Sequence, residues 1–223
     1  MLSVAATADL ARAGVFHGFR ETVATCGGDA DALLREVGLD PAQIVDPDNY
    51  VPYTALIRVL ELAAERLHRA DFGLLFGSTQ SYGLMGPLSV AAINSKTARD
   101  GVECVGRFVH FHNRAIVLAI EALADRVAQF GKLVRAAIDA ADEAGDKDTA
   151  ALAIEALADR DADLVWQDVV ISHRLKYTQL VERQIAYEHT MMARLIEDYT
   201  PLEVWFRHAP LSSLETYERL FGL

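Results

Sequence analysis

The chain lacks the residue patterns that mark several classes of protein. Its 223 residues include only two cysteines, Cys26 and Cys104, which are too few for a disulfide framework and form no CxxC pair. No apolar run approaches the roughly 20 residues of a membrane-spanning helix. The first residues show no basic region followed by an apolar stretch and a cleavage site. We therefore expect a reduced, cytoplasmic protein that contacts no membrane.

Basic residues are too few for a surface that grips nucleic acid. The chain carries 21 Lys and Arg against 32 Asp and Glu, which gives a formal net charge of −11. Domains that hold a phosphate backbone by themselves are usually basic, with clustered Lys and Arg. The charge therefore disfavours direct binding of DNA or RNA by this chain.

The motifs of common catalytic and metal sites are also missing. No serine has a GxSxG context, and the glycines between 73 and 86 form no phosphate-binding GxxxxGK[ST] loop. His110 and His112 form an HxH pair, but no second pair of His, Asp or Cys stands nearby in the sequence. We therefore predict no enzyme, no metal site and no cofactor.

The residues that are present predict a mainly helical protein. Apolar residues recur at helical spacing over 8–26, 53–68 and 177–198. Asp29, Pro87 and Thr97 are placed to begin three further helices. Segments rich in Val, Ile and Trp at 163–171 and 202–209 predict strands. The fold class is therefore α+β, a predominantly helical domain packed on a small β-sheet.

One segment, LAIEALADR, occurs twice, at 118–126 and at 152–160. No other segment repeats at this period, so the simplest interpretation is an insertion over 127–160 with a duplicated end. Without the insertion, the apolar runs on either side would form a β-hairpin. With it, the alanine content favours a helix for both copies, and we adopt that interpretation. The chain then divides into a domain over 1–126 and 161–223 and a helical insertion over 127–160.

Three blocks of the sequence contain short motifs in a characteristic order. The first block contains Gly38-Leu39-Asp40-Pro41, Asp46-Pro47-Asp48, Leu60-Glu61-Leu62-Ala63-Ala64 and Phe72-Gly73-Leu74. The second is YGLMGPLSVAAINSKTARDGVECVGRFVHF, and the third is PLEVWFRHAPLSSLETYERLFG near the end of the chain. These blocks resemble the N-terminal, arabinose-binding-like effector domain of AraC/XylS-type transcription regulators. With 127–160 set aside, the resemblance covers most of residues 10–222, and the order of weak motifs carries it.

The resemblance implies a ligand-sensing and dimerisation domain that is not an enzyme. Its implied partners are a small organic effector and a second copy of the chain in a homodimer. DNA would be contacted only through a C-terminal pair of helix-turn-helix units, which we expect beyond Leu223. Residues 131–150 are similar to the fourth-helix turn of Dps-type ferritin-like proteins, which is one helix-turn-helix fragment without a full set of iron ligands. The alternatives are an engineered or chimeric scaffold carrying a helical graft, and a small α+β enzyme.

A ligand pocket of such a sensor needs an apolar lining and a few placed polar groups. The residues of this kind that we predict to line it are Tyr82, Met85, Phe108, His112, Arg114, Trp166 and Trp205. The competing interpretation is that most of them simply pack the core. We expect Arg114 or His112 to hold the polar end of the ligand, and Arg114 could pair with a carboxylate.

Overall fold

The computed structural model describes residues 9–122, 162–168, 175–201, 204, 206 and 208–222. The chain divides into two compact units, Met1–Val117 with Asp168–Leu223 and Leu118–Gln167. The described residues are mainly helical, with two small two-stranded sheets. The α+β class predicted from the sequence is confirmed.

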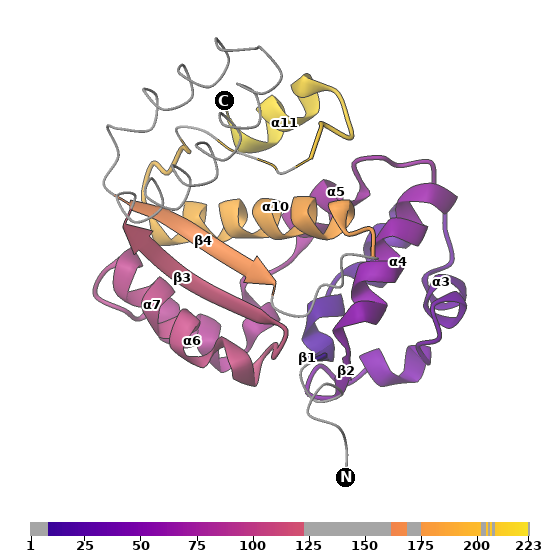
Figure 1. Ribbon diagram of the computed structural model, residues 1–223, viewed down its shortest axis with the longest axis horizontal. Coiled ribbons are helices and arrows are strands. Elements are labelled where there is room, and N and C mark those ends of the chain that lie inside the picture. The colour runs from indigo at the N-terminus through magenta and orange to yellow at the C-terminus, as the bar shows by residue number, and fades with distance from the viewer. Residues whose placement is uncertain are drawn as a thin grey trace, which may run out of the picture. The chain divides into compact units, whose positions relative to one another are not determined.

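The described part of the larger unit begins with a short strand whose partner strand lies about 40 residues later in the sequence. Strand β1 (Leu10–Arg12) lies antiparallel to β2 (Tyr50–Pro52) (Figure 1). Between the two strands run the 3₁₀ turn η1 (Ala13–Phe16), α2 (Phe19–Thr25), α3 (Ala30–Glu36) and the 3₁₀ turn η2 (Pro41–Ile44). Helix α3 begins at Asp29 as predicted, because the Asp29 carboxylate accepts a hydrogen bond from the backbone N–H of Ala32 at 3.1 Å.

Four α-helices follow β2 before the chain reaches β3 (Ile116–Ala122). They are α4 (Tyr53–Arg66), α5 (Phe72–Thr79), α6 (Pro87–Ile93) and α7 (Ala98–Phe108), with the 3₁₀ turns η3 (Tyr82–Met85) and η4 (Val109–Phe111). Pro87 opens α6 and the Thr97 hydroxyl accepts from the Asp100 N–H at 3.1 Å at the start of α7, as the sequence predicts. Helix α4 begins where the two carboxylate oxygens of Asp9 accept from the N–H and the hydroxyl of Thr54, at 2.9 and 2.7 Å.

Helix α10 (Thr178–Leu195) crosses the larger unit and packs directly on α5 (Figure 1). A Cβ atom added at Gly73 would lie 2.2 Å from the carbonyl oxygen of Gln179, and one added at Gly77 would lie 2.2 Å from that of Arg183. The two helix backbones therefore touch, and only glycine fits at both positions. The helix predicted over 177–198 is confirmed within α10.

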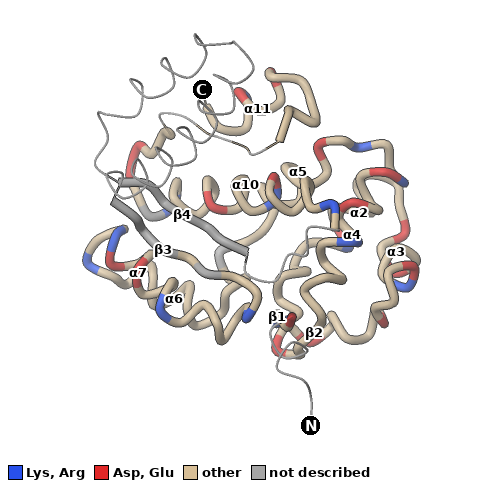
Figure 2. The backbone as a smooth tube through the Cα atoms, in the orientation of Figure 1, with Lys and Arg blue, Asp and Glu red and all other residues tan. Residues whose placement is uncertain are grey.

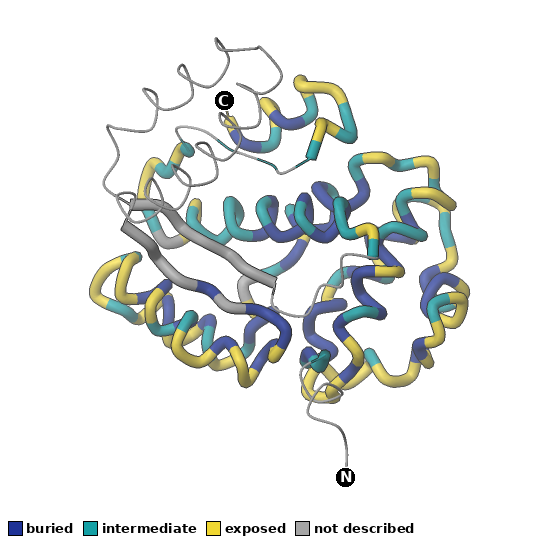
Figure 3. The backbone as a smooth tube through the Cα atoms, viewed as in Figure 1, coloured by how far each residue is buried: buried dark blue, intermediate teal, exposed yellow. Residues whose placement is uncertain are grey.

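The core of the larger unit is built around aromatic rings. Phe19 makes edge contacts with Phe16, Phe72 and Phe76, with ring centroids 5.7 to 6.2 Å apart. A second cluster joins α5 and α10 to α11 (Leu214–Phe221) through Leu74, Ala186, Tyr217 and Phe221. Figure 3 shows buried positions along α4, α5 and α10 and exposed ones along α3 and the outer side of α6.

The single helix predicted over 8–26 is wrong for the described residues. Residues 10–12 form β1 because their backbone groups pair with β2. The helix that follows starts only at Phe19, after Gly18 adopts a φ of +80°, which a helix interior does not allow. Long-range strand pairing has therefore outweighed the apolar periodicity of this segment.

The smaller unit contributes a strand pair. Strand β3 (Ile116–Ala122) lies beside β4 (Ala162–Asp168), and their arrows run in opposite directions in Figure 1. The strand predicted at 163–171 is confirmed over 163–168. The helix predicted for 118–126 is wrong for 118–122, because pairing with β4 outweighs the helix preference of alanine. Residues 123–126, the second copy at 152–160 and the insertion at 127–160 lie outside the described residues, so the domain boundaries stay predictions.

The strand predicted at 202–209 does not form at the positions that are described. Val204, Phe206 and His208 belong to no strand. Val204 and Phe206 instead pack against the cluster that includes Tyr217 and Phe221. Their apolar character thus serves side-chain packing against α11 rather than a sheet.

Candidate functional site

His112 is the buried histidine of the site that the sequence predicts. It follows η4, and its backbone carbonyl accepts a hydrogen bond from the N–H of Arg12 in β1 at 2.7 Å. The next residue, Asn113, forms a bridge to Ala11. The backbone of β1 therefore draws this residue inward, and the His112 side chain is only 2% exposed.

The imidazole of His112 has no hydrogen-bond partner for either Nδ1 or Nε2 among the described residues. Buried polar groups in folded proteins are nearly always hydrogen-bonded, because an unsatisfied one costs about 1–3 kcal/mol. Burial, followed by the positive charges of Arg183 and Arg12, lowers the pKa of His112 to about 3. The ring is therefore neutral near pH 7 and lies in a positive potential.

Arg183, in α10, supplies the larger part of that potential. Its side chain is buried, and the residue is 3% exposed. The guanidinium carbon lies 5.8 Å from the ring centre of Phe76 and 5.6 Å from that of Tyr187. Such aromatic faces stabilise a desolvated guanidinium and hold it in one orientation. Because the Arg183 carbonyl rests against Gly77, the position of the side chain is set by the contact between α5 and α10.

Arg12, in β1 near the start of the chain, also lowers the pKa of His112. Its guanidinium pairs with Asp48, which is largely exposed. It also lies close to Gly86, where an added Cβ would come within 2.9 Å of the Arg12 Nη1 atom. Gly86 has a φ of +58° and directly follows Met85, so the turn after η3 makes room for the guanidinium.

Further buried polar groups lie along α10. Gln184 donates from Nε2 to the hydroxyl of Tyr53 at 2.9 Å. The side-chain amide of Gln179 donates to the Ala70 carbonyl at 2.7 Å and accepts from the Gly73 N–H at 2.6 Å. These bonds fix the rotation of α10 about its own axis, and with it the side on which Arg183 lies.

Glu182 forms a separate link between α10 and α11. The hydroxyl of Tyr217 donates to Glu182 Oε1 and accepts from the N–H of Leu211 at 2.9 Å. Burial raises the pKa of Glu182 to about 7; the Tyr217 hydrogen bond opposes this, and the negative charges of Asp71 and Glu61 add to it. Burial and the bond to Glu182 raise the pKa of Tyr217 to about 12.

The structure brings together only part of the predicted set. Met85 is buried with 7% of its surface exposed, beside the Gly86 turn, whereas Phe108 is 39% exposed and stacks on Phe111 with ring centroids 6.5 Å apart. Arg114 is exposed, and its guanidinium lies 5.2 Å from the ring centre of Tyr50. The backbones of Tyr82 and Trp166 are described in η3 and β4, but their side chains are not, and Trp205 lies outside the described residues.

Sequence reasoning missed Arg183, Gln184 and Tyr53. The polar residues of 177–198 look like the solvent-facing side of an amphipathic helix, so nothing in α10 itself marks them as buried. A signal existed elsewhere, since Gly73 and Gly77 lie four residues apart on one helical face. Such spacing allows a second helix to approach closely, and the helix that does so here is α10.

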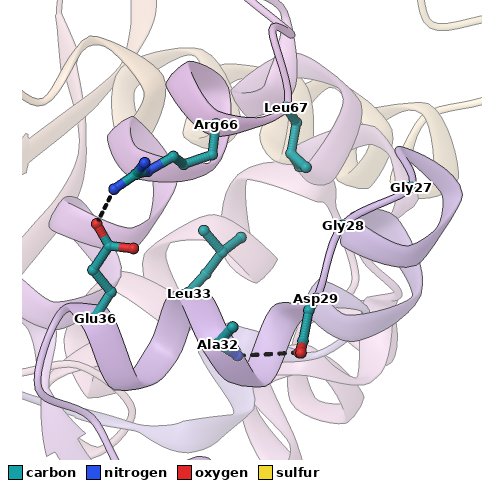
Figure 4. Close-up of a pocket in the computed structure, with 8 residues that line it drawn as sticks. All are labelled: Gly27, Gly28, Asp29, Ala32, Leu33, Glu36, Arg66 and Leu67. Carbon is teal, nitrogen blue, oxygen red and sulfur yellow. Dashed lines mark hydrogen bonds and ion pairs between the residues drawn. The ribbon is translucent and has the colours of Figure 1, made fainter.

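A surface hollow of about 360 Å³ lies between α3 and the end of α4 (Figure 4). Leu33 and Leu67 extend into it, and the ion pair between Glu36 and Arg66, 2.5 Å long, closes one side. The Asp29 carboxylate already holds the Ala32 N–H. These polar groups are satisfied within the protein, so this hollow offers a ligand much less than His112 does.

The described residues contain neither a metal-binding cluster nor a membrane-spanning helix. No group of three His, Cys, Asp or Glu side chains lies together there in a way that could hold a metal ion. His110 is exposed against the ring of Phe111, so the HxH pair divides between surface and interior. None of the helices in the described ranges has the length and apolarity to cross a lipid bilayer.

Comparison with models of known protein families shows the family to which the chain belongs. Residues 27–223 match the family model of the arabinose-binding domain of AraC transcription regulators, an N-terminal domain. Because this match covers most of the chain, the chain belongs to that family. The resemblance predicted from the three sequence blocks is confirmed.

Curated relatives of the chain carry a specific name. The HTH-type transcriptional regulator VirS of Mycobacterium tuberculosis, in strains CDC 1551 / Oshkosh and ATCC 25618 / H37Rv, is 30% identical over 117 residues. This alignment covers 52% of the present chain and 34% of each relative. The chain therefore matches about a third of the length of these regulators.

Proposed function

We propose that this chain is the effector-sensing domain of an AraC-type transcription regulator, and that a small organic molecule binds beside His112. The observation that carries the proposal is the His112 imidazole, which is 2% exposed and has both nitrogens without a partner among the described residues. A ligand group that bonds to this ring would remove the cost of leaving it unsatisfied. The rings of Phe76 and Tyr187 beside Arg183 supply apolar surface in the same unit.

In this proposal the ligand is bound and released unchanged, and it changes how a regulator presents its DNA-reading part. A ligand can do this only if it binds two arrangements of the protein with different affinity. Arg183 could couple the ligand to the rest of the domain, because a ligand that interacts with its guanidinium would act on α10. Helix α10 is in turn joined to α11 by the hydrogen bond between Glu182 and Tyr217. A homodimer would be the assembly in which two such domains act together.

Reading of DNA belongs, in the same proposal, to another part of the regulator. The VirS relatives are named helix-turn-helix regulators, and this chain matches only a third of their length. The net charge of −11 opposes binding to a phosphate backbone. Figure 2 shows acidic and basic residues interspersed along the described elements, with no continuous basic stripe on them. We expect the purified chain to show no sequence-selective retention of a promoter fragment in a mobility-shift assay, and nanomolar selective binding would contradict the proposal.

Ligand binding is tested by thermal melts of the chain with a defined set of small molecules. The set contains arabinose, benzoate, octanoate and the amides benzamide and octanamide, each at millimolar concentration. At 100 times its dissociation constant, a ligand that binds only the folded state stabilises it by about 2.7 kcal/mol. We expect at least one compound to raise the melting temperature, and to do so much less in the His112→Phe variant. A melt that no compound shifts would refute a sensor site at His112.

His110→Phe is the matched control for this variant. It makes the same exchange two residues away, at an exposed histidine whose ring contacts only Phe111 among the ring contacts described. Arg114→Ala tests the other polar residue that the sequence singled out. Because Arg114 is exposed over Tyr50, we expect its replacement to weaken binding less than His112→Phe does.

A further inference from the structure

The larger unit carries aromatic side chains on its surface where β2 meets the turn η4. The hydroxyl of Tyr50, the first residue of β2, donates to the backbone carbonyl of Phe111 at 2.7 Å. Phe111 stacks on Phe108, with ring centroids 6.5 Å apart, and Arg114 lies over the ring of Tyr50. Phe111 is 61% exposed, and Tyr50 and Phe108 are exposed as well. These contacts join the four residues into one surface, which we name the aromatic face.

The composition of the aromatic face is typical of a surface that binds another protein. Aromatic residues and arginine are enriched where proteins meet, and contiguous exposed apolar groups often mark such places. Association would remove the stacked rings from water, which is favourable. The bond from Tyr50 and the pairing of β1 with β2 already hold the two segments of the face together, so little ordering is needed on binding.

Charged residues of both signs border this face. Asp46 and Asp48 lie in the exposed loop that leads into β2 (Figure 3), and Arg107 and Arg114 are exposed near the end of α7 and after η4. Asp48 is paired with Arg12. Asp46, Arg107 and Arg114 form no ion pair with any other residue that the structure describes. The face thus has an acidic edge at Asp46 and a basic edge at the two arginines.

We infer that the aromatic face binds the same face of a second copy of the chain, with the acidic edge of each copy against the basic edge of the other. The inference rests on the homodimer of the proposed function and names the surface that forms it. In a dimer with two-fold symmetry one patch meets itself, so each contact between two different residues occurs twice. Asp46 of each copy would then meet Arg114 of the other, and the aromatic rings would pack between these two contacts.

Charge favours a second copy over a DNA-reading part of the regulator as the occupant. Parts that hold a phosphate backbone are basic, and the unpaired Arg107 and Arg114 would repel such a part more than Asp46 attracts it. Two copies of a chain with a net charge of −11 repel each other on approach. The aromatic face has two unpaired arginines against one unpaired aspartate, so two acidic copies meet less repulsion here than the charge of the whole chain implies.

Sedimentation of the wild-type chain over a range of concentrations measures self-association without any ligand. We expect a reversible dimer, and Phe111→Asp should raise its dissociation constant by about tenfold or more, because a charge replaces an aromatic anchor. The bond from Tyr50 is kept in this variant, since it ends on the backbone of Phe111. Leu214→Asp is the matched control, because it puts the same charge at a 66% exposed apolar residue of α11, and its dissociation constant should equal that of the wild type.

Two charge reversals test the pairing of the edges and do not depend on the aromatic variant. Asp46→Arg and Arg114→Asp each place like charges opposite each other in a homodimer. Each variant alone should therefore be monomeric at a concentration where the wild type is mostly dimeric. A mixture of the two variants should dimerise again, because opposite charges then meet at both contacts.

The possible results separate this surface from the rest of the proposed function. A wild-type chain that stays monomeric up to millimolar concentration overturns the homodimer and leaves the aromatic face to another part of the regulator, while the melts with small molecules still decide the ligand site at His112. If the chain dimerises and Phe111→Asp does not weaken the dimer, the homodimer stands on another surface and the inference falls. A mixture of the two reversed variants that stays monomeric overturns the pairing of acidic with basic edges.

Discussion

The contact between α5 and α10 makes a strong prediction for Gly77→Ala. The new methyl carbon would stand 2.2 Å from the carbonyl oxygen of Arg183, and this oxygen is backbone and cannot rotate away. Alanine by itself favours a helix over glycine by about 1 kcal/mol, while an overpacked contact costs about 1–3 kcal/mol and sometimes more. Since the displaced group is the backbone of a buried helix, the packing cost prevails.

We expect Gly77→Ala to lower the free energy of unfolding by about 2 kcal/mol, near the middle of the range for overpacking. For a chain of this size that corresponds to a fall in melting temperature of about 4–8 °C. Thermal and urea unfolding followed by circular dichroism would measure it. Gly83→Ala is the matched control, because its added carbon would meet nothing closer than the Ser81 hydroxyl at 3.7 Å, and we expect a change within about 0.5 kcal/mol. A Gly77→Ala protein as stable as the wild type would refute the backbone contact.

Three further predictions concern other parts of the chain. In Glu182→Gln the side-chain amide can still accept the hydrogen bond from Tyr217. Because burial raises the pKa of Glu182 to about 7, the free energy of unfolding of the wild type falls by up to about 3 kcal/mol as the pH rises from 4.5 to 7. Urea melts should show a smaller fall over this pH range in the variant. An identical fall with pH in both proteins would exclude Glu182 as its source. Asp9→Ala should cost about 1 kcal/mol in the same assay, because Thr54 at the start of α4 loses both bonds, whereas no loss would show that the cap is not needed. Removal of 127–160 should leave a soluble protein with a cooperative melt, and an insoluble product would contradict an insertion.

The sign for Glu182 follows from proton linkage. Between pH 4.5 and 7 the folded state keeps the proton that the unfolded chain has released, so the folded state binds more protons. The stability therefore falls as the pH rises through this window. Below it both states are protonated, and above it both are ionised, so the contribution no longer changes with pH.

Local signals were sufficient for much of the helical fold. Asp29 and Thr97 cap the helices that the sequence assigns to them, because a cap needs only the residue and its nearest N–H groups. The helices at 53–66 and 178–195 follow from apolar spacing over several turns. These features depend on residues close together in the chain, which is the information that one sequence holds most directly.

Elements that depend on distant partners were not predictable in the same way. Residues 10–12 form a strand because β2, some 40 positions away, offers a backbone edge, and 118–122 form one because β4 does. The apolar and alanine patterns of these segments favour helices when considered alone. Pairing with a distant strand decides between helix and strand in both segments, and the residues within each segment do not indicate that pairing.

The candidate site was partly predictable for the same reason. His112 was named from its type and its neighbours, but its burial depends on β1 through the bond between its carbonyl and the Arg12 N–H. Arg183 was not named, because a charged residue on an amphipathic helix is normally solvent-facing. Its burial depends on the two glycines of α5, which lie more than a hundred residues earlier.

That separation along the chain has a kinetic consequence. The hydrogen bond between Gly73 and Gln179 joins residues 106 positions apart, whereas β1 finds its partner β2 only about 40 positions further along the chain. Contacts of long sequence separation form slowly, because a large loop must close before they give any stabilisation. We therefore expect docking of α10 to be a late step of folding, and Arg183 to meet His112 only then. A ligand that bridges the two would hold the last-formed part of the domain in place, so it should slow unfolding and leave the folding rate unchanged.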